Sequence, residues 1–468
     1  AVTLFDFRGR RQLEWPLLLP LAMPAYVTAY AYTDFLQFSG PLQTWLRDTY
    51  GLEGRLLPEV RSLGGAVWVF IFSLYPYVYL LARTALGERA AHLMEAARLM
   101  GAPLSRRIWS VALPLARPAV AAGVALVVME TLADFGVVSY FGIQTFTTGI
   151  YKAWLSMDNR IAAAQLATFL LVLVVLLLQL ELRAQRRMRF VTGGAGRAGS
   201  AEAQPLRLRG WRCALAWLVC LLPVLMGFVA PVFFMLRPLA ADWSVLPWDR
   251  FLDWALNSVR LGAITSVLAV IIAVALAFAV RRHKESAVTR GVVQLASLGY
   301  AVPGAVVVVG LLLPVGWVQQ VRPEWGFAGL VTATAVGIVW AYLVRFCAVA
   351  LQSMQSGYAR IAPSLDDSAR MLGTGAWGML SRVHWPLLRR STAAAALLVF
   401  VDVMKELPAT MVLRPFNSDT LAVVAYQLAR DERLGEAALP SLALVLVGLI
   451  PVIMLSRTLR AERPGTAR

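Results

Sequence analysis

Apolar residues in this chain gather into long runs that are separated by short basic segments. Ten of these runs are each about 20 residues long, the length of helix that crosses the hydrocarbon core of a membrane. Strands of a membrane barrel would give shorter segments of alternating polarity. The runs are residues 16–34, 63–85, 118–140, 161–182, 211–236, 257–280, 291–314, 327–350, 391–413 and 437–456. The pattern predicts an all-α integral membrane protein.

The composition supports this class. Hydrophobic residues make up 59% of the 468 residues and charged residues only 15%. Soluble domains carry about 45–50% apolar and about 25% charged residues. With a mean hydropathy of +0.65, the chain has more apolar surface than a water-soluble fold can bury, so the lipid bilayer is its expected surroundings.

The charge is strongly basic, with 44 Lys and Arg against 27 Asp and Glu, a net +17. Such an excess can indicate nucleic-acid binding, but membrane proteins also concentrate basic residues in their cytoplasmic loops. If residues 1–15 are cytoplasmic, 30 basic residues fall inside and 11 outside, and Arg260, Arg345 and Lys405 lie within spans. The asymmetry predicts that both ends of the chain are cytoplasmic, and it needs no nucleic-acid partner.

The chain divides into two membrane halves at a linker rich in Arg and Gly. The linker is residues 183–210, and it separates a first half, residues 1–182, from a second half, residues 211–468. The first half has about four spans and the second about six. We therefore expect that the first half is truncated and lacks its first two helices; a complete ten-helix protein is the alternative.

The two halves also resemble each other in sequence. The segment Glu95–Gly101 matches Asp367–Gly373 at an offset of 272 residues, and Ala22–Ala25 matches Ala301–Gly304 at an offset of 279. Both copies of the first segment fall on the same predicted side of the membrane. The repeats are therefore expected to have parallel topology, related by an axis along the membrane normal.

The repeated segment predicts a short helix, a turn and a second helix at the membrane surface. The run from Glu95 to Met100 favours helix, Gly101 can end it in a left-handed conformation, and Pro103 can start the next helix. A single copy could simply anchor a loop to lipid head groups. Two copies at matching places indicate a paired docking surface.

This pattern resembles the EAA loop of binding-protein-dependent ABC importer permeases. The first copy has Glu95, Ala96, Ala97, Gly101, Leu113 and Pro114, and the second has Asp367, Ala369, Gly373 and Pro386. The second copy departs from the family pattern in its first two positions and at Trp385, which puts the strength of its contact in doubt. Further segments, among them Leu19–Tyr26 and Tyr140–Tyr151, resemble the fused ferric-iron permeases.

The resemblance implies a fold of two tandem permease repeats and a mechanism. Each EAA loop would form a coupling helix in a groove of an ATP-binding subunit, so the expected partners are two copies of that subunit and a periplasmic solute-binding protein. ATP and Mg would belong to the ATP-binding subunits, in the bacterial inner membrane system. Ferric iron is the expected cargo, with thiamine or a phosphonate as alternatives.

The chain itself is not expected to be an enzyme. None of its three Lys residues stands in the G-x-x-x-x-G-K-[ST] pattern of an ATP-binding loop. An ATP-independent secondary transporter or channel is the alternative of a different class, although it has no use for two matching loops.

Four acidic residues lie within or near predicted spans, where a charge is costly and often functional. They are Glu130, Asp134, Asp402 and Glu406, in two pairs spaced four residues apart. They could line a path for a hard cation, or they could brace the protein, with Lys405 neutralising one of the second pair. No resident metal site is predicted, because His92, His283 and His384 are scattered along the chain.

Overall fold

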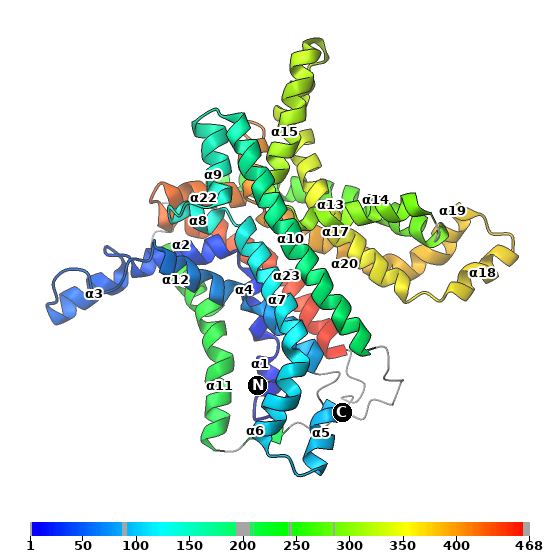
Figure 1. Cartoon of the computed structure of the whole chain (residues 1–468). Coiled ribbons are helices and arrows are strands. Elements are labelled where there is room, and N and C mark those ends of the chain that lie inside the picture. The colour runs from blue at the N-terminus through cyan, green and yellow to red at the C-terminus, as the bar shows by residue number, and fades with distance from the viewer. Residues whose placement is uncertain are drawn as a thin grey trace. The chain divides into compact units, whose positions relative to one another are not determined.

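The computed structural model describes residues 2–86, 91–192, 206–208, 210–241, 243, 246–283 and 286–461. Contacts divide the chain into two compact units. Figure 1 colours the chain by residue number, so the segments of each unit can be found from the bar. Unit 1 consists of Ala1–Thr148, Val172–Leu246 and Leu428–Arg468, and unit 2 of Gly149–Leu171 and Pro247–Gln427. Each unit thus takes segments from both sides of the predicted linker.

Unit 1 is built of helices and one pair of two-residue parallel strands. Its elements are β1 (Phe5–Asp6), α1 (Arg10–Leu13), η1 (Pro16–Ala22), α2 (Ala25–Leu36), α3 (Pro41–Tyr50), α4 (Leu63–Ala85), α5 (Ala91–Leu99), α6 (Leu104–Arg107), η3 (Ile108–Ala112), α7 (Leu113–Ala133), α8 (Gly136–Tyr140), β2 (Leu206–Arg207), α11 (Trp211–Val224), η5 (Leu225–Val229), α12 (Ala230–Ala241) and α23 (Leu434–Ala461). Helices α9 (Phe146–Tyr151) and α10 (Arg160–Thr192) cross into or out of unit 2.

Unit 2 is helical throughout the part that is described. It holds η4 (Lys152–Ser156), α13 (Trp248–Arg282), α14 (Ala287–Leu298), η6 (Gly299–Ala301), α15 (Gly304–Val321), η7 (Pro323–Trp325), α16 (Phe327–Thr332), α17 (Ala335–Ala359), α18 (Pro363–Met371), α19 (Ala376–Gly378), η8 (Met379–His384), α20 (Trp385–Lys405) and α21 (Pro408–Leu413). Helix α22 (Leu421–Arg430) begins in unit 2 and ends in unit 1.

The cores are made where the long helices pack together. In unit 2, α13, α17 and α20 pack pairwise against one another and bury Tyr342, Leu351 and Met354 almost completely. In unit 1, α4 and α7 pack along their length. Gly123 permits this approach, because a Cβ there would lie only 2.7 Å from Val78 Cα.

Eight of the described helices are long and apolar enough to cross a membrane, compared with the ten spans predicted. They are Leu63–Ala85, Leu104–Ala133, Arg160–Leu180, Trp211–Ala241, Trp248–Arg282, Gly304–Val321, Ala335–Ala359 and Leu434–Ser456. The predicted span 16–34 is divided between η1 and α2. The predicted span 391–413 is divided between α20 and α21, and α20 carries charged residues near both ends.

Proline explains two matching interruptions. Pro24 immediately precedes α2 with φ −58° and ψ 141°, and Pro303 immediately precedes α15 with φ −57° and ψ 142°. Proline cannot donate the backbone hydrogen bond that would continue the preceding helix, and it disfavours helix for the residue before it. The two prolines are 279 residues apart, the same offset at which the surrounding segments match, so they mark one break that occurs in both halves. The apolar run 291–314 is interrupted there as well.

The sequence repeat has a direct structural counterpart. Helix α5 and helix α18 have bounds that differ by 272 residues at both ends, and so do α7 and α20. A π-helical turn precedes each helix of the second pair: η3 comes directly before α7, and η8 directly before α20. The tandem all-α organisation predicted from the sequence is confirmed at the level of single elements.

Candidate coupling loops and buried carboxylates

The first loop, residues 91–114, turns sharply at Gly101. Gly101 has φ +79°, its N–H donates to the Arg98 carbonyl at 3.0 Å, and the Ala102 N–H donates to the Ala97 carbonyl at 3.0 Å. This is the glycine-terminated Schellman end of a helix, which satisfies carbonyls that the helix itself leaves unpaired. Pro103 then precedes α6, as the sequence predicts. Leu113 and Pro114 form the first turn of α7.

The second loop, residues 363–386, repeats this geometry. Gly373 has φ +75°, its N–H donates to the Arg370 carbonyl at 2.9 Å, and the Thr374 N–H donates to the Ala369 carbonyl at 3.0 Å. Pro386 lies in the first turn of α20. The divergence of the second copy at its acidic and Leu-Pro positions therefore leaves the turn unchanged.

The third residue of each motif faces inward and the tips of the helices face outward. Ala97 and Ala369 are buried, and Ala96 is exposed. Beyond them, Leu99 and Met100 are 85% and 80% exposed, and the corresponding Met371 and Leu372 are 91% and 85% exposed. Large apolar side chains so fully exposed at matching places are typical of a surface that contacts another protein or the membrane.

Each loop carries one acidic motif residue, Glu95 in the first and Asp367 in the second. The backbone of Glu95 belongs to α5, but its side chain lies outside the described part of the structure. Asp367 is exposed and accepts a hydrogen bond from Arg370 one turn later, at 3.2 Å.

A polar network that sequence reasoning missed lies beneath the second loop. Asp366 accepts hydrogen bonds from Arg281 Nε at 2.6 Å and Arg281 Nη2 at 3.0 Å, and His384 Nε2 lies 3.0 Å from its Oδ1. Burial raises the pKa of Asp366, but the hydrogen bonds and charges of Arg281 and His384 outweigh this and hold its pKa below the ordinary value. The sequence suggested that His384 is an isolated residue. The structure instead makes it part of this network.

Glu406, one of the four predicted path residues, is buried and fully engaged within unit 2. Its Oε1 accepts hydrogen bonds from Arg345 Nη1 at 2.8 Å and from the Ala409 N–H at 2.9 Å. Its Oε2 accepts from the Thr410 N–H at 2.9 Å and from Thr410 Oγ1 at 2.7 Å. Glu406 thus caps the N-terminus of α21, where a carboxylate is favoured, and Arg345 compensates its charge. Of the two partners that the sequence offered for Lys405, Asp402 is the one with which it interacts, and Glu406 is paired with Arg345 instead.

Asp134 has the corresponding position in unit 1. Its Oδ1 accepts hydrogen bonds from the N–H groups of Val137 at 3.0 Å and Val138 at 3.2 Å, which caps α8 in the same way. The position matching Arg345 is Ser73, whose hydroxyl lies 3.4 Å from that of Thr28. The two capping carboxylates are therefore equivalent in the backbone but not in charge compensation.

The other two predicted path residues lie one turn earlier. Glu130 is half-buried on α7 and interacts electrostatically with Asp134. Asp402 is half-buried on α20 and interacts electrostatically with Lys405. Each acidic pair belongs to a different unit. Among the described residues, no three His, Cys, Asp or Glu side chains gather in a way that could hold a metal ion.

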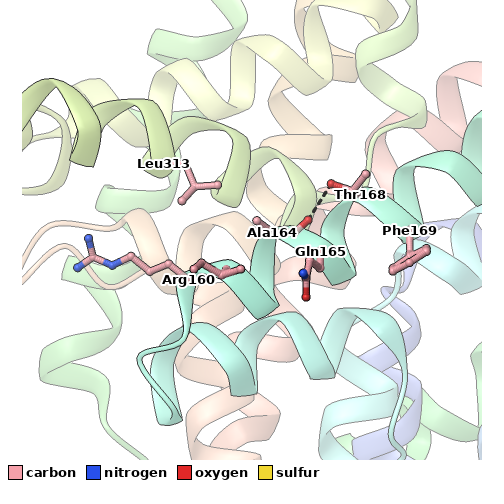
Figure 2. A pocket seen from close by; sticks show the side chains of 7 residues that line it. Arg160, Ala164, Gln165, Thr168, Phe169 and Leu313 are labelled. Atoms are coloured by element: carbon pink, nitrogen blue, oxygen red, sulfur yellow. Dashed lines mark hydrogen bonds between the residues drawn. The ribbon is translucent and has the colours of Figure 1, made fainter.

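A cavity of about 400 Å³ lies elsewhere in unit 2, between the start of α10 and α15 (Figure 2). Leu313, Ala164 and Phe169 give it a mainly apolar lining, with Arg160 and Gln165 at its side. None of the predicted site residues lines it.

Comparison with known proteins finds a family model that matches the part of the chain holding the first loop. Residues 60–190 match the family model described as the binding-protein-dependent transport system inner membrane component. The matched stretch runs from α4 into α10 and includes the whole first loop. The matched stretch is 131 of the 468 residues, and over it the chain resembles this family. Together with the eight long apolar helices, the match supports a multi-pass protein of the inner membrane.

The chain is also similar to curated relatives, to two of them over most of its length. It is 24% identical over 456 residues to a Fe(3+)-transport system permease protein of Haemophilus influenzae, which covers 97% of this chain and 84% of the relative. It is 22% identical over 441 residues to a ferric transport system permease protein of Actinobacillus pleuropneumoniae, covering 89% and 61%. A putative 2-aminoethylphosphonate transport system permease protein of Salmonella typhimurium is 30% identical over 133 residues, covering 28% and 49%.

Proposed function

We propose that this chain is the transmembrane permease subunit of an ATP-driven importer that moves ferric iron into the cytoplasm. The observation that carries the proposal is the pair of loops with the same glycine-terminated turn and the same exposed apolar tip. Two equivalent docking surfaces on one chain suit two identical partner subunits.

Those partners are ATP-binding subunits at the cytoplasmic face, and ATP and Mg belong to them. The residues proposed to contact them are the motif residues of the two loops, Glu95, Gly101, Asp367 and Gly373 among them. A periplasmic solute-binding protein delivers the cargo at the other face. The excess of basic residues in the segments that contain both loops supports this orientation, with both ends of the chain in the cytoplasm.

The half-buried acids are the residues we propose to face the cargo. Asp134 and Glu406 are engaged by backbone N–H groups, whereas Glu130 and Asp402 lie one turn earlier on the helices that follow the loops. Carboxylate oxygens suit a hard cation such as Fe³⁺. Glu130→Gln together with Asp402→Asn tests this: unchanged uptake with intact coupling to ATP hydrolysis would remove these residues from the path.

Iron is favoured as the cargo because the relatives that align with 97% and 89% of the chain are named as ferric transporters. The phosphonate relative aligns with only 28%, but its identity is higher, so a phosphonate is the second candidate. A strain that lacks the chain should regain uptake of radioactive ferric iron, and not of 2-aminoethylphosphonate or thiamine, when the chain is restored. Restored phosphonate or thiamine uptake without iron uptake would refute the assignment of iron.

The alternative of an ATP-independent transporter is tested by purification. We expect an ATPase to co-purify with the chain, and we expect substitutions at Gly101 to reduce that association. Full transport by the purified chain without any ATPase would refute the proposed class.

A further inference from the structure

The two loops have the same backbone turn but are attached to their units by opposite chemistry. In unit 1, Met94 and Ala112 are buried together, and Leu4, Leu86 and Ile108 pack against them. In unit 2, three of the residues 272 positions further on carry polar groups, whereas Leu4 and Ile108 correspond to Leu276 and Leu380. Met94 corresponds to Asp366, Ala112 to His384, and Leu86 to Tyr358. An apolar cluster in one half is replaced by a polar network in the other.

Arg281 is the centre of this network. It stands one residue before the C-terminus of α13, and its fork holds the Asp366 carboxylate of α18 with two hydrogen bonds. Its Nη1 also donates to the carbonyls of Tyr358 and Ile361, at 3.0 and 3.1 Å, and its Nη2 to that of Ala362 at 3.2 Å. One guanidinium therefore joins the end of α13, the end of α17 and the start of α18.

His384 connects the other side of the second loop to the same carboxylate. Its Nε2 lies 3.0 Å from Asp366 Oδ1 and its Nδ1 lies 3.4 Å from the Tyr358 hydroxyl. The side chains of Arg281, Asp366 and His384 are 12%, 8% and 1% exposed. The network is thus enclosed within unit 2, where hydrogen bonds are stronger than in water.

The two attachments differ in how they respond to displacement. Apolar packing has no directional requirement, so side chains can slide past one another with little loss. A two-pronged Arg–carboxylate contact fixes both distance and angle. The second loop is therefore held to α13 in one geometry, while the first loop can shift relative to its own unit.

We infer that Arg281, Asp366 and His384 are positioning residues that transmit movement of the second loop to α13, and that the described side chains of the first loop form no such rigid link. The inference rests on the proposed function, in which an ATP-binding subunit moves each loop. It predicts that the network is needed for coupling of ATP hydrolysis to transport, beyond any need for folding.

The test uses the full complex of this chain with its ATP-binding subunits in proteoliposomes, supplied with binding protein loaded with ferric iron. The measured quantity is the iron transported per ATP hydrolysed. Arg281→Lys keeps the charge but loses the two-pronged contact. The triple variant Arg281→Met, Asp366→Met and His384→Ala gives the second loop an apolar attachment like that of the first. Arg282→Gln, which removes a charge from the adjacent exposed residue, is the matched control.

We expect Arg281→Lys and the triple variant to assemble and hydrolyse ATP, while the iron transported per ATP falls by about 2- to 30-fold, the usual range of coupling between distant sites. Arg282→Gln should retain the ratio of the unaltered chain. An unchanged ratio in the triple variant would overturn the inference. So would failure of both variants to assemble when Arg282→Gln assembles, because the network would then serve folding alone. Absence of ATP-driven uptake by the unaltered chain is a different outcome, which overturns the proposed function itself.

Discussion

Replacing Glu406 by Gln removes the charge of a buried carboxylate whose hydrogen-bond partners are all donors. Its side chain is 1% exposed, that of Arg345 is 15% exposed, and the two are 2.8 Å apart. Both oxygens of Glu406 accept hydrogen bonds. The amide group of Gln would turn a donor toward one of these donors and leave the Arg345 charge without compensation.

The expected loss follows from these contacts. Breaking one side of a buried ion pair costs about 3–5 kcal/mol. For a domain of about 150–250 residues each kcal/mol lowers Tm by about 2–4 °C, so we expect a fall on the order of 10 °C. The assay is thermal unfolding of the purified chain in one detergent, followed by circular dichroism.

The control for this variant is a more exposed pair in the same unit. Arg414 Nε lies 2.7 Å from Asp419 Oδ1, with side chains 21% and 39% exposed. Asp419→Asn should cost no more than about 1 kcal/mol, the usual value of an exposed pair. Adding Arg345→Met to Glu406→Gln should recover part of the loss, because no uncompensated charge remains. A Tm for Glu406→Gln no lower than that of Asp419→Asn would refute this reasoning.

Three further outcomes are expected. Gly101→Ala forces a side chain into φ +79°, which costs about 1–2 kcal/mol, so ATPase association measured by co-purification should weaken. Leu99→Ser together with Met100→Ser should reduce co-purification without lowering Tm, since both side chains are exposed; retained association would exclude the tip from the contact. The hydrogen bond from Arg61 lowers the pKa of Glu432, and burial opposes it only in part. The pair therefore stabilises the chain above the ordinary pKa of about 4.3 and loses this effect as pH falls through the lower folded value. Acid unfolding of Glu432→Gln should then show a smaller loss of Tm below pH 4.3 than the unaltered chain, and identical pH curves would contradict it.

The sequence was sufficient to predict the all-α class, the repeat and the turn at each loop, because each depends on local chemistry. Gly101 and Gly373 both end a helix in the left-handed region that glycine adopts without strain. The proline breaks could also have been read from Pro24 and Pro303. The apolar residues around them concealed the breaks, because hydropathy does not distinguish a broken span from a continuous one.

The pairing of Glu406 with Arg345 was not predictable, because it is determined by tertiary packing. Lys405 is adjacent to Glu406 in sequence, but neighbouring residues do not face each other on a helix, and Glu406 already lies beyond the end of α20. Its partner comes from α17, 61 residues away. Asp366 and His384 did leave a signal. Each is a polar residue at a position where the first half has an apolar one.

The most direct test of the account is iron uptake by proteoliposomes that contain the chain, its ATP-binding subunits and ATP, with loaded binding protein outside. The account predicts uptake that requires ATP and that is lost when the exposed tips of both loops, Leu99–Met100 and Met371–Leu372, are replaced by Ser. Uptake that proceeds equally without ATP, or that is unaffected by the loss of both tips, would contradict the central claim that the two loops couple this permease to an ATPase.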